Sequence, residues 1–275
     1  MAPAVDSNSA SAPSSARLAS PDLQLCRLCK RPAALQRSHL LPAWCYRRII
    51  EDSDDAQPVQ ITKDSAVFSN EQVREHLLCQ RCEEKFGKIE DKVKRLTCYK
   101  NGQQRIFCRL NFISDRSGHR HELDSETANI LSYFAASVIW RAHAMGKGCE
   151  LGPYGEKFRQ FLLDAGDFPA DAFVAVMIIQ SSESGIDPKG WLTNPSSTRV
   201  DGFRIHGFIA SGLVFRLFVG RRLPAVIKRW FLGHPASPRC VVAVRPWNEC
   251  QDAWGALELL KQTTSRGKLA RMSGA

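Results

Sequence analysis

Residues 77–91 read LLCQRCEEKFGKIED, and this stretch sets the expectation for the first third of the chain. Two cysteines three positions apart, Cys79 and Cys82, follow a pair of leucines and precede a charged segment. Within residues 83–96 the apolar side chains recur every three or four positions, at Phe86, Ile89, Val93 and Leu96. This spacing predicts an amphipathic helix, so we expect the cysteine pair where that helix begins.

A second pair, Cys26 and Cys29 in CRLC, precedes the first, and 49 residues separate the two pairs. Backbone N–H groups of a CxxC turn point at the sulfur atoms, and two such turns can close a tetrahedron around one zinc ion. The alternative is a thiol redox pair, which typically opens a helix within a βαβ unit, and Pro32 disfavours that context after CRLC. We therefore predict a structural Zn²⁺ bound by four thiolates, those of Cys26, Cys29, Cys79 and Cys82.

Composition indicates a folded protein. Of the 275 residues, 44% are apolar and 24% are charged, which suits one large domain or a small domain beside a larger one. The longest apolar run, residues 205–219, is broken by His206 and Arg216, so it predicts buried strands and no membrane span. Because the chain is too long for a small disulfide scaffold and its CxxC pairs suit a reducing compartment, we expect a cytoplasmic protein.

The charge is unevenly distributed. The formal net charge is +10, and residues 199–275 hold 13 Lys and Arg against 4 Asp and Glu, a net of +9. A cationic face attracts the phosphate backbone of a nucleic acid and releases its counterions. The alternative is a basic surface without a polyanionic partner, because net charge bears mainly on non-specific association.

The chain divides by composition into four regions. Residues 1–21, rich in Ala, Ser and Pro, predict a disordered leader. Residues 22–112 hold both cysteine pairs and form a zinc module, residues 113–262 form an α+β domain, and residues 263–275 form a basic flexible tail. The expected fold class is therefore α+β, with a small zinc-stabilised module followed by a helical and mostly antiparallel-sheet domain.

Within the predicted α+β domain, residues 113–262, two helices precede several strands. The signal LDSE (123–126) precedes apolar residues at helical spacing, Leu131, Phe134, Ala135 and Val138, and a second helix repeats the spacing at Phe158, Phe161, Leu162 and Ala165. Four apolar segments predict strands: 173–180, 203–210, 213–220 and 240–244. Ser211 and Gly212 are expected to form the hairpin turn between the middle two.

The order of motifs carries a resemblance. C-x2-C, then Ser-His-Leu-Leu-Pro (38–42), then Leu-Leu-Cys-x2-Cys and a helix with a glycine near its start is similar to the HNH endonuclease superfamily, and closest to bacterial members with "SHIIP"-like and "LLCxxCE" segments. The similar region spans residues 26–90, about a quarter of the chain. The resemblance implies a ββα-metal fold (HNH-like, treble-clef-like), a structural zinc on the four cysteines and a metal-dependent nuclease.

The resemblance also implies roles for single residues. By position, His39 matches the general base that takes a proton from water, and a divalent cation would neutralise charge on the phosphate. In many family members an acid precedes this histidine, whereas this chain has Ser38. Glu83 and Glu90 lie seven positions apart on one helical stripe with Gly87 between them, so we expect them to bind Mg²⁺ or Mn²⁺ and count them with His39 as catalytic.

The remaining expectations concern the substrate. Arg37, Arg47 and Arg48 flank the histidine motif and suit phosphate contacts, which position a nucleic acid without reading its sequence. We expect a nuclease that hydrolyses phosphodiester bonds, with DNA as its substrate. The alternative is a non-catalytic, zinc-stabilised protein that binds nucleic acid or another partner, with His39 packed as an ordinary polar residue and Glu83 and Glu90 as solvated charges.

Overall fold

The computed structural model describes residues 23–50, 59–61, 65–69, 71–100, 103–113, 119–180, 190–200, 202–220, 232, 240–250 and 264–266. Within these residues the protein has four α-helices, a seven-stranded sheet and four two-stranded sheets. The predicted leader, residues 1–21, and most of the predicted tail, residues 263–275, lie outside this part of the chain.

The N-terminal elements are β1 (Gln24–Leu25), β2 (Pro32–Ala33), β3 (Leu35–His39), α1 (Ala43–Ile50), β4 (Val59–Ile61), β5 (Ala66–Phe68), β6 (Arg74–Cys79), α2 (Gln80–Thr97), β7 (Tyr99–Lys100) and β8 (Gln103–Gln104). The later elements are the 3₁₀-helix η1 (Arg105–Arg109), β9 (Leu110–Phe112), β10 (Arg120–Leu123), α3 (Ser125–Ala144), α4 (Tyr154–Leu162), β11 (Ala172–Gln180), β12 (Ser196–Val200), β13 (Phe203–Ala210), β14 (Leu213–Val219), β15 (Cys240–Pro246) and the 3₁₀-helix η3 (Trp247–Glu249).

Two strands and a helix form the frame around the cysteine pairs. Strands β3 and β6 pair antiparallel, with Leu35 opposite Cys79 and His39 opposite Arg74. Helix α2 follows β6 without a loop, and the segment between the two strands carries α1 and the β4–β5 pair. The predicted helix over 83–96 is confirmed, because α2 spans it and buries two of the predicted apolar positions, Phe86 and Val93.

The large sheet has the strand order β12-β13-β14-β11-β15-β10-β9. Every neighbouring pair in it is antiparallel except β11 and β15, so the expectation of a mostly antiparallel sheet is confirmed. The predicted turn between β13 and β14 is also present. Its residues, Ser211 and Gly212, have φ values of 51° and 77°, the left-handed conformation that two-residue hairpins require.

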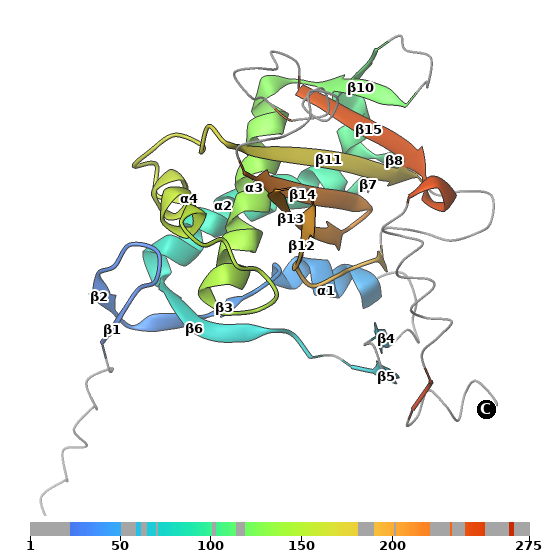
Figure 1. The fold of residues 1–275 in the computed structure, drawn as a ribbon. Helices are drawn as coiled ribbons and strands as arrows, with labels where there is room; N and C mark the ends of the chain where they lie inside the picture. The colour runs from blue at the N-terminus through green and yellow to red at the C-terminus, as the bar shows by residue number, and fades with distance from the viewer. Residues whose placement is uncertain are drawn as a thin grey trace, which may run out of the picture.

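Helix α3 connects the sheet to the frame around the cysteine pairs (Figure 1). Its predicted start is confirmed, since the Asp124 carboxylate accepts a hydrogen bond of 2.8 Å from the backbone N–H of Thr127. The helix packs against α2 and α4 and also against strands β11 and β14. Its predicted apolar positions are fully buried: Leu131, Phe134, Ala135 and Val138.

One hydrophobic core crosses the boundary between the two predicted units. A single cluster of buried residues extends from Cys26 in the first CxxC turn to Val244 in β15. Strand β9, which lies within the predicted zinc module, forms an edge of the large sheet. Near the other end of the chain, the backbone N–H of Ala66 donates to the carbonyl of Thr264 at 3.1 Å, and that of Arg266 donates to the carbonyl of Ala66 at 3.0 Å. Among the described helices, none has both the length and the apolar composition to cross a lipid bilayer.

Candidate functional site

The two cysteine pairs occupy two kinds of turn. Cys26 and Cys29 lie in the turn between β1 and β2, which is closed by a 2.8 Å hydrogen bond from the Lys30 N–H to the Cys26 carbonyl. Cys79 ends β6 and caps α2, and Cys82 lies in the first turn of that helix. A strand-to-helix junction thus faces a hairpin turn.

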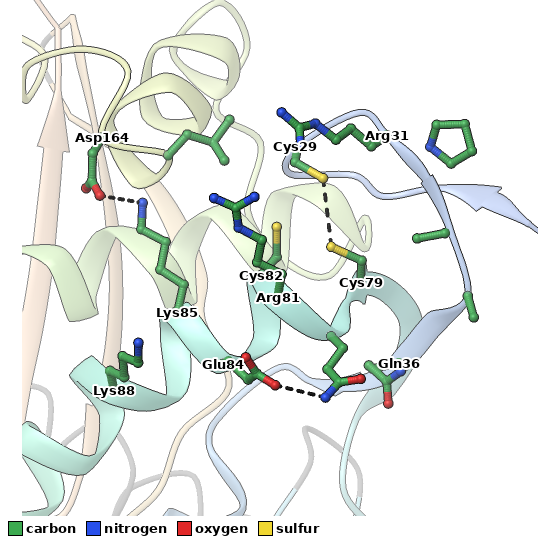
Figure 2. A pocket seen from close by; sticks show the side chains of 15 residues that line it. Cys29, Arg31, Gln36, Cys79, Arg81, Cys82, Glu84, Lys85, Lys88 and Asp164 are labelled. Atoms are coloured by element: carbon green, nitrogen blue, oxygen red, sulfur yellow. Dashed lines mark hydrogen bonds and ion pairs between the residues drawn. The ribbon is translucent and has the colours of Figure 1, made fainter.

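The geometry of these four thiols suits a metal ion. Their Sγ atoms all lie within 4.8 Å of one another, and the Cys29 and Cys79 sulfurs are 3.8 Å apart. A tetrahedral zinc with Zn–S bonds of about 2.3 Å places its sulfurs about 3.8 Å apart. The sulfurs of Cys29 and Cys79 face each other at the edge of a groove (Figure 2). The four predicted ligands can therefore hold a structural metal such as zinc.

Thiolate character is favoured at one of the four cysteines, Cys26. The Cys82 thiol donates to the Cys26 sulfur, and the backbone N–H of Cys79 points at the same sulfur from 3.3 Å. These hydrogen bonds outweigh burial and lower the pKa of Cys26 to about 4. The pKa of Cys82 is raised because its proton is held in that hydrogen bond. A thiolate is the form of cysteine that binds a metal.

His39 ends strand β3 and is held from two sides. Its Nε2 atom lies 2.9 Å from the Gln72 side-chain oxygen, and its backbone carbonyl accepts a 2.9 Å hydrogen bond from Arg141. With the Gln72 oxygen as acceptor, Nε2 carries the hydrogen and the lone pair of the neutral ring lies on Nδ1. Burial lowers the pKa of His39, and the charges of Arg74 and Arg141 lower it further. The ring is therefore neutral at neutral pH.

The two predicted carboxylates of α2 are half-buried but differ in their partners. Glu90 Oε1 forms a 2.6 Å ion pair with Arg141 Nη2, whereas Glu83 Oε1 is buried without a hydrogen-bond partner among the described residues. Burial raises the pKa of Glu83, opposed by the nearby Ser38 hydroxyl and by Arg141. A Cβ added at Gly87, between the two, would meet no heavy atom of the described structure within 4 Å.

Ser38 has a defined role beside this pair. Its side chain is 1% exposed, and its hydroxyl accepts a 3.2 Å hydrogen bond from the backbone N–H of Leu78 on β6. The same hydroxyl lowers the pKa of Glu83. Ser38 therefore links β3 to β6 and favours the ionised form of Glu83.

Arg141 is a residue of this site that the sequence patterns did not predict. It lies on α3, 102 positions from His39, with only 1% of its surface exposed, yet its guanidinium bonds both the His39 carbonyl and Glu90. The signal was present, because Arg141 continues the apolar stripe of Phe134 and Val138 at helical spacing. A charged residue on a buried helical face requires a partner, and here it has two.

The three predicted phosphate contacts separate into two groups. Arg37 and Arg47 are exposed, but Arg48 is 8% exposed and donates to the carbonyls of Thr97 and Lys94 at 3.0 and 3.1 Å. It also donates to the Thr97 hydroxyl at 2.6 Å and lies over the Trp44 ring. These contacts occupy its guanidinium at the C-terminus of α2. This corrects the expectation for Arg48, which is a buried structural cation.

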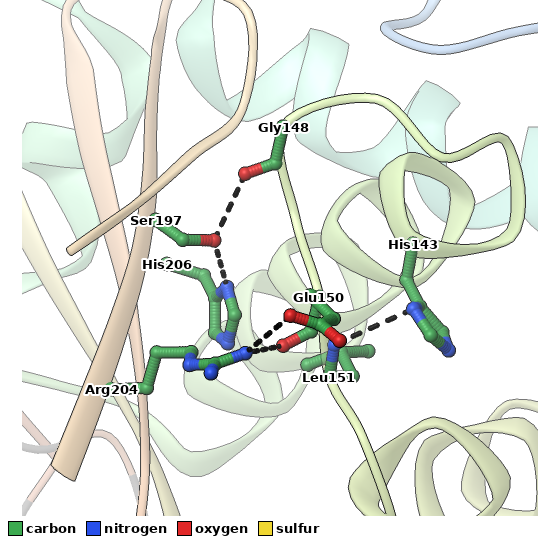
Figure 3. A network of polar contacts seen from close by, with 7 residues as sticks. All are labelled: His143, Gly148, Glu150, Leu151, Ser197, Arg204 and His206. Carbon is green, nitrogen blue, oxygen red and sulfur yellow. Dashed lines mark hydrogen bonds and ion pairs between the residues drawn. The ribbon is translucent and has the colours of Figure 1, made fainter. Parts of the chain in front are cut away.

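A second polar network lies at the edge strand β12 (Figure 3). Ser197 Oγ donates to the Gly148 carbonyl at 3.0 Å and lies 2.7 Å from Nδ1 of the buried His206. Because its hydroxyl proton is used by the carbonyl, Ser197 accepts from Nδ1–H, and His206 does not act as its base. This network joins β12 and β13 to the loop after α3, a structural role.

Comparison of this chain with family models, with curated proteins and with solved structures finds no match. Its function has to be argued from the residues themselves.

Proposed function

We propose that this protein is a metal-dependent nuclease that hydrolyses phosphodiester bonds, with His39 as its general base. The observation that carries the proposal is the buried guanidinium of Arg141, which bonds the His39 carbonyl and the Glu90 carboxylate and whose charge lowers the pKa of Glu83. His39, Glu83 and Glu90 come from two elements, β3 and α2, and the cysteine cluster brings the start of α2 against the β1–β2 turn that precedes β3. The HNH-like character of this hairpin and helix belongs to the same proposal.

His39 is suited to remove a proton from water. A base must be unprotonated at the working pH, and burial together with two nearby arginines lowers the pKa of His39. The 2.9 Å contact with Gln72 fixes the ring, so that Nδ1 is the basic atom. The bond from Arg141 fixes the backbone of the same residue.

The carboxylates fit a hard cation only in part. Glu83 offers a buried oxygen without a partner among the described residues, and cations favour the ionised form of such a group. Glu90 shares its charge with Arg141. When bound, Mg²⁺ or Mn²⁺ would supply Lewis-acid stabilisation of the charge that develops on the phosphate. Glu83 is therefore the principal residue that would hold it.

Exposed cations beside His39 suit the phosphate backbone. Arg74 faces His39 across the β3–β6 pair, where directly opposed Cβ atoms lie about 5 Å apart, and its side chain is exposed. Arg37 is exposed on the same pair of strands, and Arg47 is exposed on α1. We propose a nucleic acid, DNA in the first instance, as the substrate, and Arg74 replaces Arg48 among its expected contacts.

The proposal also includes a structural role for zinc and a cytoplasmic location. A zinc ion on the four cysteines would fix the start of α2 against the β1–β2 turn, and so hold Glu83 beside Ser38. The part of the chain that the structure describes holds all ten cysteines and shows no disulfide, in keeping with the proposed cytoplasmic location.

One specific observation favours a second candidate, a zinc-stabilised nucleic-acid-binding module without catalysis. Arg141 already supplies Glu90 with a positive charge at 2.6 Å, which is the charge a metal ion would otherwise supply. In that case the exposed arginines would bind a nucleic acid and His39 would only connect β3 to Gln72.

Cleavage of nucleic acid separates the two candidates. Zinc-loaded protein is incubated with supercoiled plasmid, linear duplex DNA or RNA, in Mg²⁺ or Mn²⁺. His39→Ala is compared with His76→Ala, whose histidine is exposed on the adjacent strand. We expect His39→Ala alone to lose cleavage, by roughly a hundredfold or more. Binding without cleavage by the wild type would favour the second candidate.

A further inference from the structure

We propose that Arg141 is a positioning residue of this site, which fixes the His39 end of β3 for hydrolysis and competes with the divalent cation for Glu90. The inference rests on the proposed function and deepens it. It makes helix α3, outside the predicted zinc module, part of the site.

The first argument is the burial of the charge. Arg141 is 1% exposed and lies within a core of apolar side chains, with its guanidinium 5.4 Å from the centroid of the Phe86 ring. Packing alone does not call for a charge here, because an unbranched apolar side chain of similar length would fill this stripe without the desolvation cost of a buried cation. Its Nε atom has no acceptor within the described structure, so not every hydrogen-bond donor of the guanidinium has a partner. The charge is retained for its two bonded partners.

The second argument is the choice of those partners. Nη1 donates to the His39 carbonyl at 2.9 Å, and Nη2 donates to Glu90 Oε1 at 2.6 Å. A planar guanidinium sets the directions of both bonds at once, so it fixes the end of β3 relative to α2. Gln72 holds the ring of the same histidine from another side. A catalytic base displaced by about 1 Å can lose about a hundredfold in rate, so such fixation matters for turnover.

The third argument concerns the cation. A guanidinium in contact with Glu90 neutralises the carboxylate that a divalent cation needs, and its positive charge repels the cation as well. The pair Arg141–Glu90 therefore weakens metal binding while it supports the base. These two effects have opposite signs, and a purely structural role would not produce that combination.

The test uses the full-length, zinc-loaded protein. Arg141→Met and Arg141→Lys are compared with the wild type and with Arg48→Met, a matched loss of a buried arginine that bonds backbone carbonyls at the far end of α2. Mn²⁺ affinity is measured by electron paramagnetic resonance without substrate, and kcat is measured at saturating Mn²⁺. Zinc content and circular dichroism confirm that each variant is folded.

For Arg141→Met we expect Mn²⁺ to bind about tenfold more tightly, because a charge beside Glu90 is lost. At the same time kcat should fall by roughly tenfold or more, because the His39 strand end is no longer fixed. Arg141→Lys keeps the charge but cannot make both bonds, so Mn²⁺ affinity should stay near that of the wild type while kcat falls. Arg48→Met should change neither quantity.

Several results would overturn the inference. If Arg141→Met keeps the wild-type kcat, Arg141 does not position His39. If Mn²⁺ binding does not tighten, Arg141 does not compete with the cation for Glu90, and either result overturns the inference as stated. Should Arg141→Met fail to fold, Arg141→Lys decides, because an unchanged kcat there excludes positioning through the paired bonds. A wild type that cleaves and depends on His39, combined with indifferent Arg141 variants, leaves the proposed function in place. A wild type that cleaves nothing removes both.

Discussion

The stability of this protein should fall steeply in mild acid because of one buried histidine, His206. Its side chain is 0% exposed, Nδ1 lies 2.7 Å from Ser197 Oγ, and Nε2 has no hydrogen-bond partner among the described residues. Burial, reinforced by the charge of Arg204 and by His143, lowers the pKa of His206 from 6.5 to about 4. Protonation would place a positive charge in this buried position (Figure 3).

The sign follows from the direction of that pKa shift. Between pH 6.5 and pH 4 the unfolded chain binds a proton that the folded chain does not, so the contribution is fully present above pH 6.5 and is lost as the pH falls towards 4. Each pH unit in this window corresponds to about 1.4 kcal/mol, so the free energy of unfolding should be about 2 kcal/mol lower at pH 5 than at pH 7.5 from this group alone.

Urea unfolding at both pH values measures this effect. Wild type is compared with His206→Asn, whose amide N–H can still reach Ser197 but does not titrate. The variant should be less stable at pH 7.5, and it should lose about 2 kcal/mol less than the wild type on going to pH 5. Equal losses in the two proteins would show that His206 is not buried in its neutral form, and would refute the network drawn around it.

Three further outcomes follow from the described contacts. Cys82→Ser, or treatment with a strong chelator, should release zinc and raise the rate of hydrogen exchange in β1, β2 and the first turn of α2. Metal binding and local folding are coupled at such a site. If the cysteines were instead a thiol redox pair, the exchange rates would not change. Arg48→Ala should lower the free energy of unfolding by about 3 kcal/mol, since it removes hydrogen bonds from a buried cation to α2. Arg47→Ala, one position earlier and exposed, should leave that free energy nearly unchanged, and equal costs would contradict the placement of Arg48. Gln72→Ala should slow cleavage at saturating Mg²⁺ with little change in KM, because Gln72 orients His39 and is not proposed to contact the substrate. An effect on KM alone would contradict that role.

Local patterns in the sequence predicted those parts of the fold that local forces determine. The stripe from Phe86 to Leu96 predicted α2, and Asp124 predicted the start of α3, because spacing and capping act over a few residues. Ser211 and Gly212 predicted a hairpin for the same reason. Strand β12 was not predicted, since all five of its residues are exposed and show no alternation.

The pairing of strands that lie far apart along the chain could not be predicted from the sequence patterns. Strands β11 and β15 pair in parallel across some sixty intervening residues, and β9 joins the large sheet from within the predicted zinc module. The candidate site shows the same division. The grouping of the four cysteines followed from their spacing, but the burial of Arg48 and the contacts of Arg141 depend on how α1 and α3 pack on α2. Packing of this kind leaves only a weak signal in one sequence, here a charge on an apolar stripe.

In the proposed reaction His39 takes the proton from the attacking water. The most direct measurement is the rate at which zinc-loaded His39→Ala nicks supercoiled DNA in Mg²⁺, with and without added imidazole, relative to wild type. We expect a loss of roughly a hundredfold or more, partly restored by imidazole. A His39→Ala protein that nicks at the wild-type rate would contradict it.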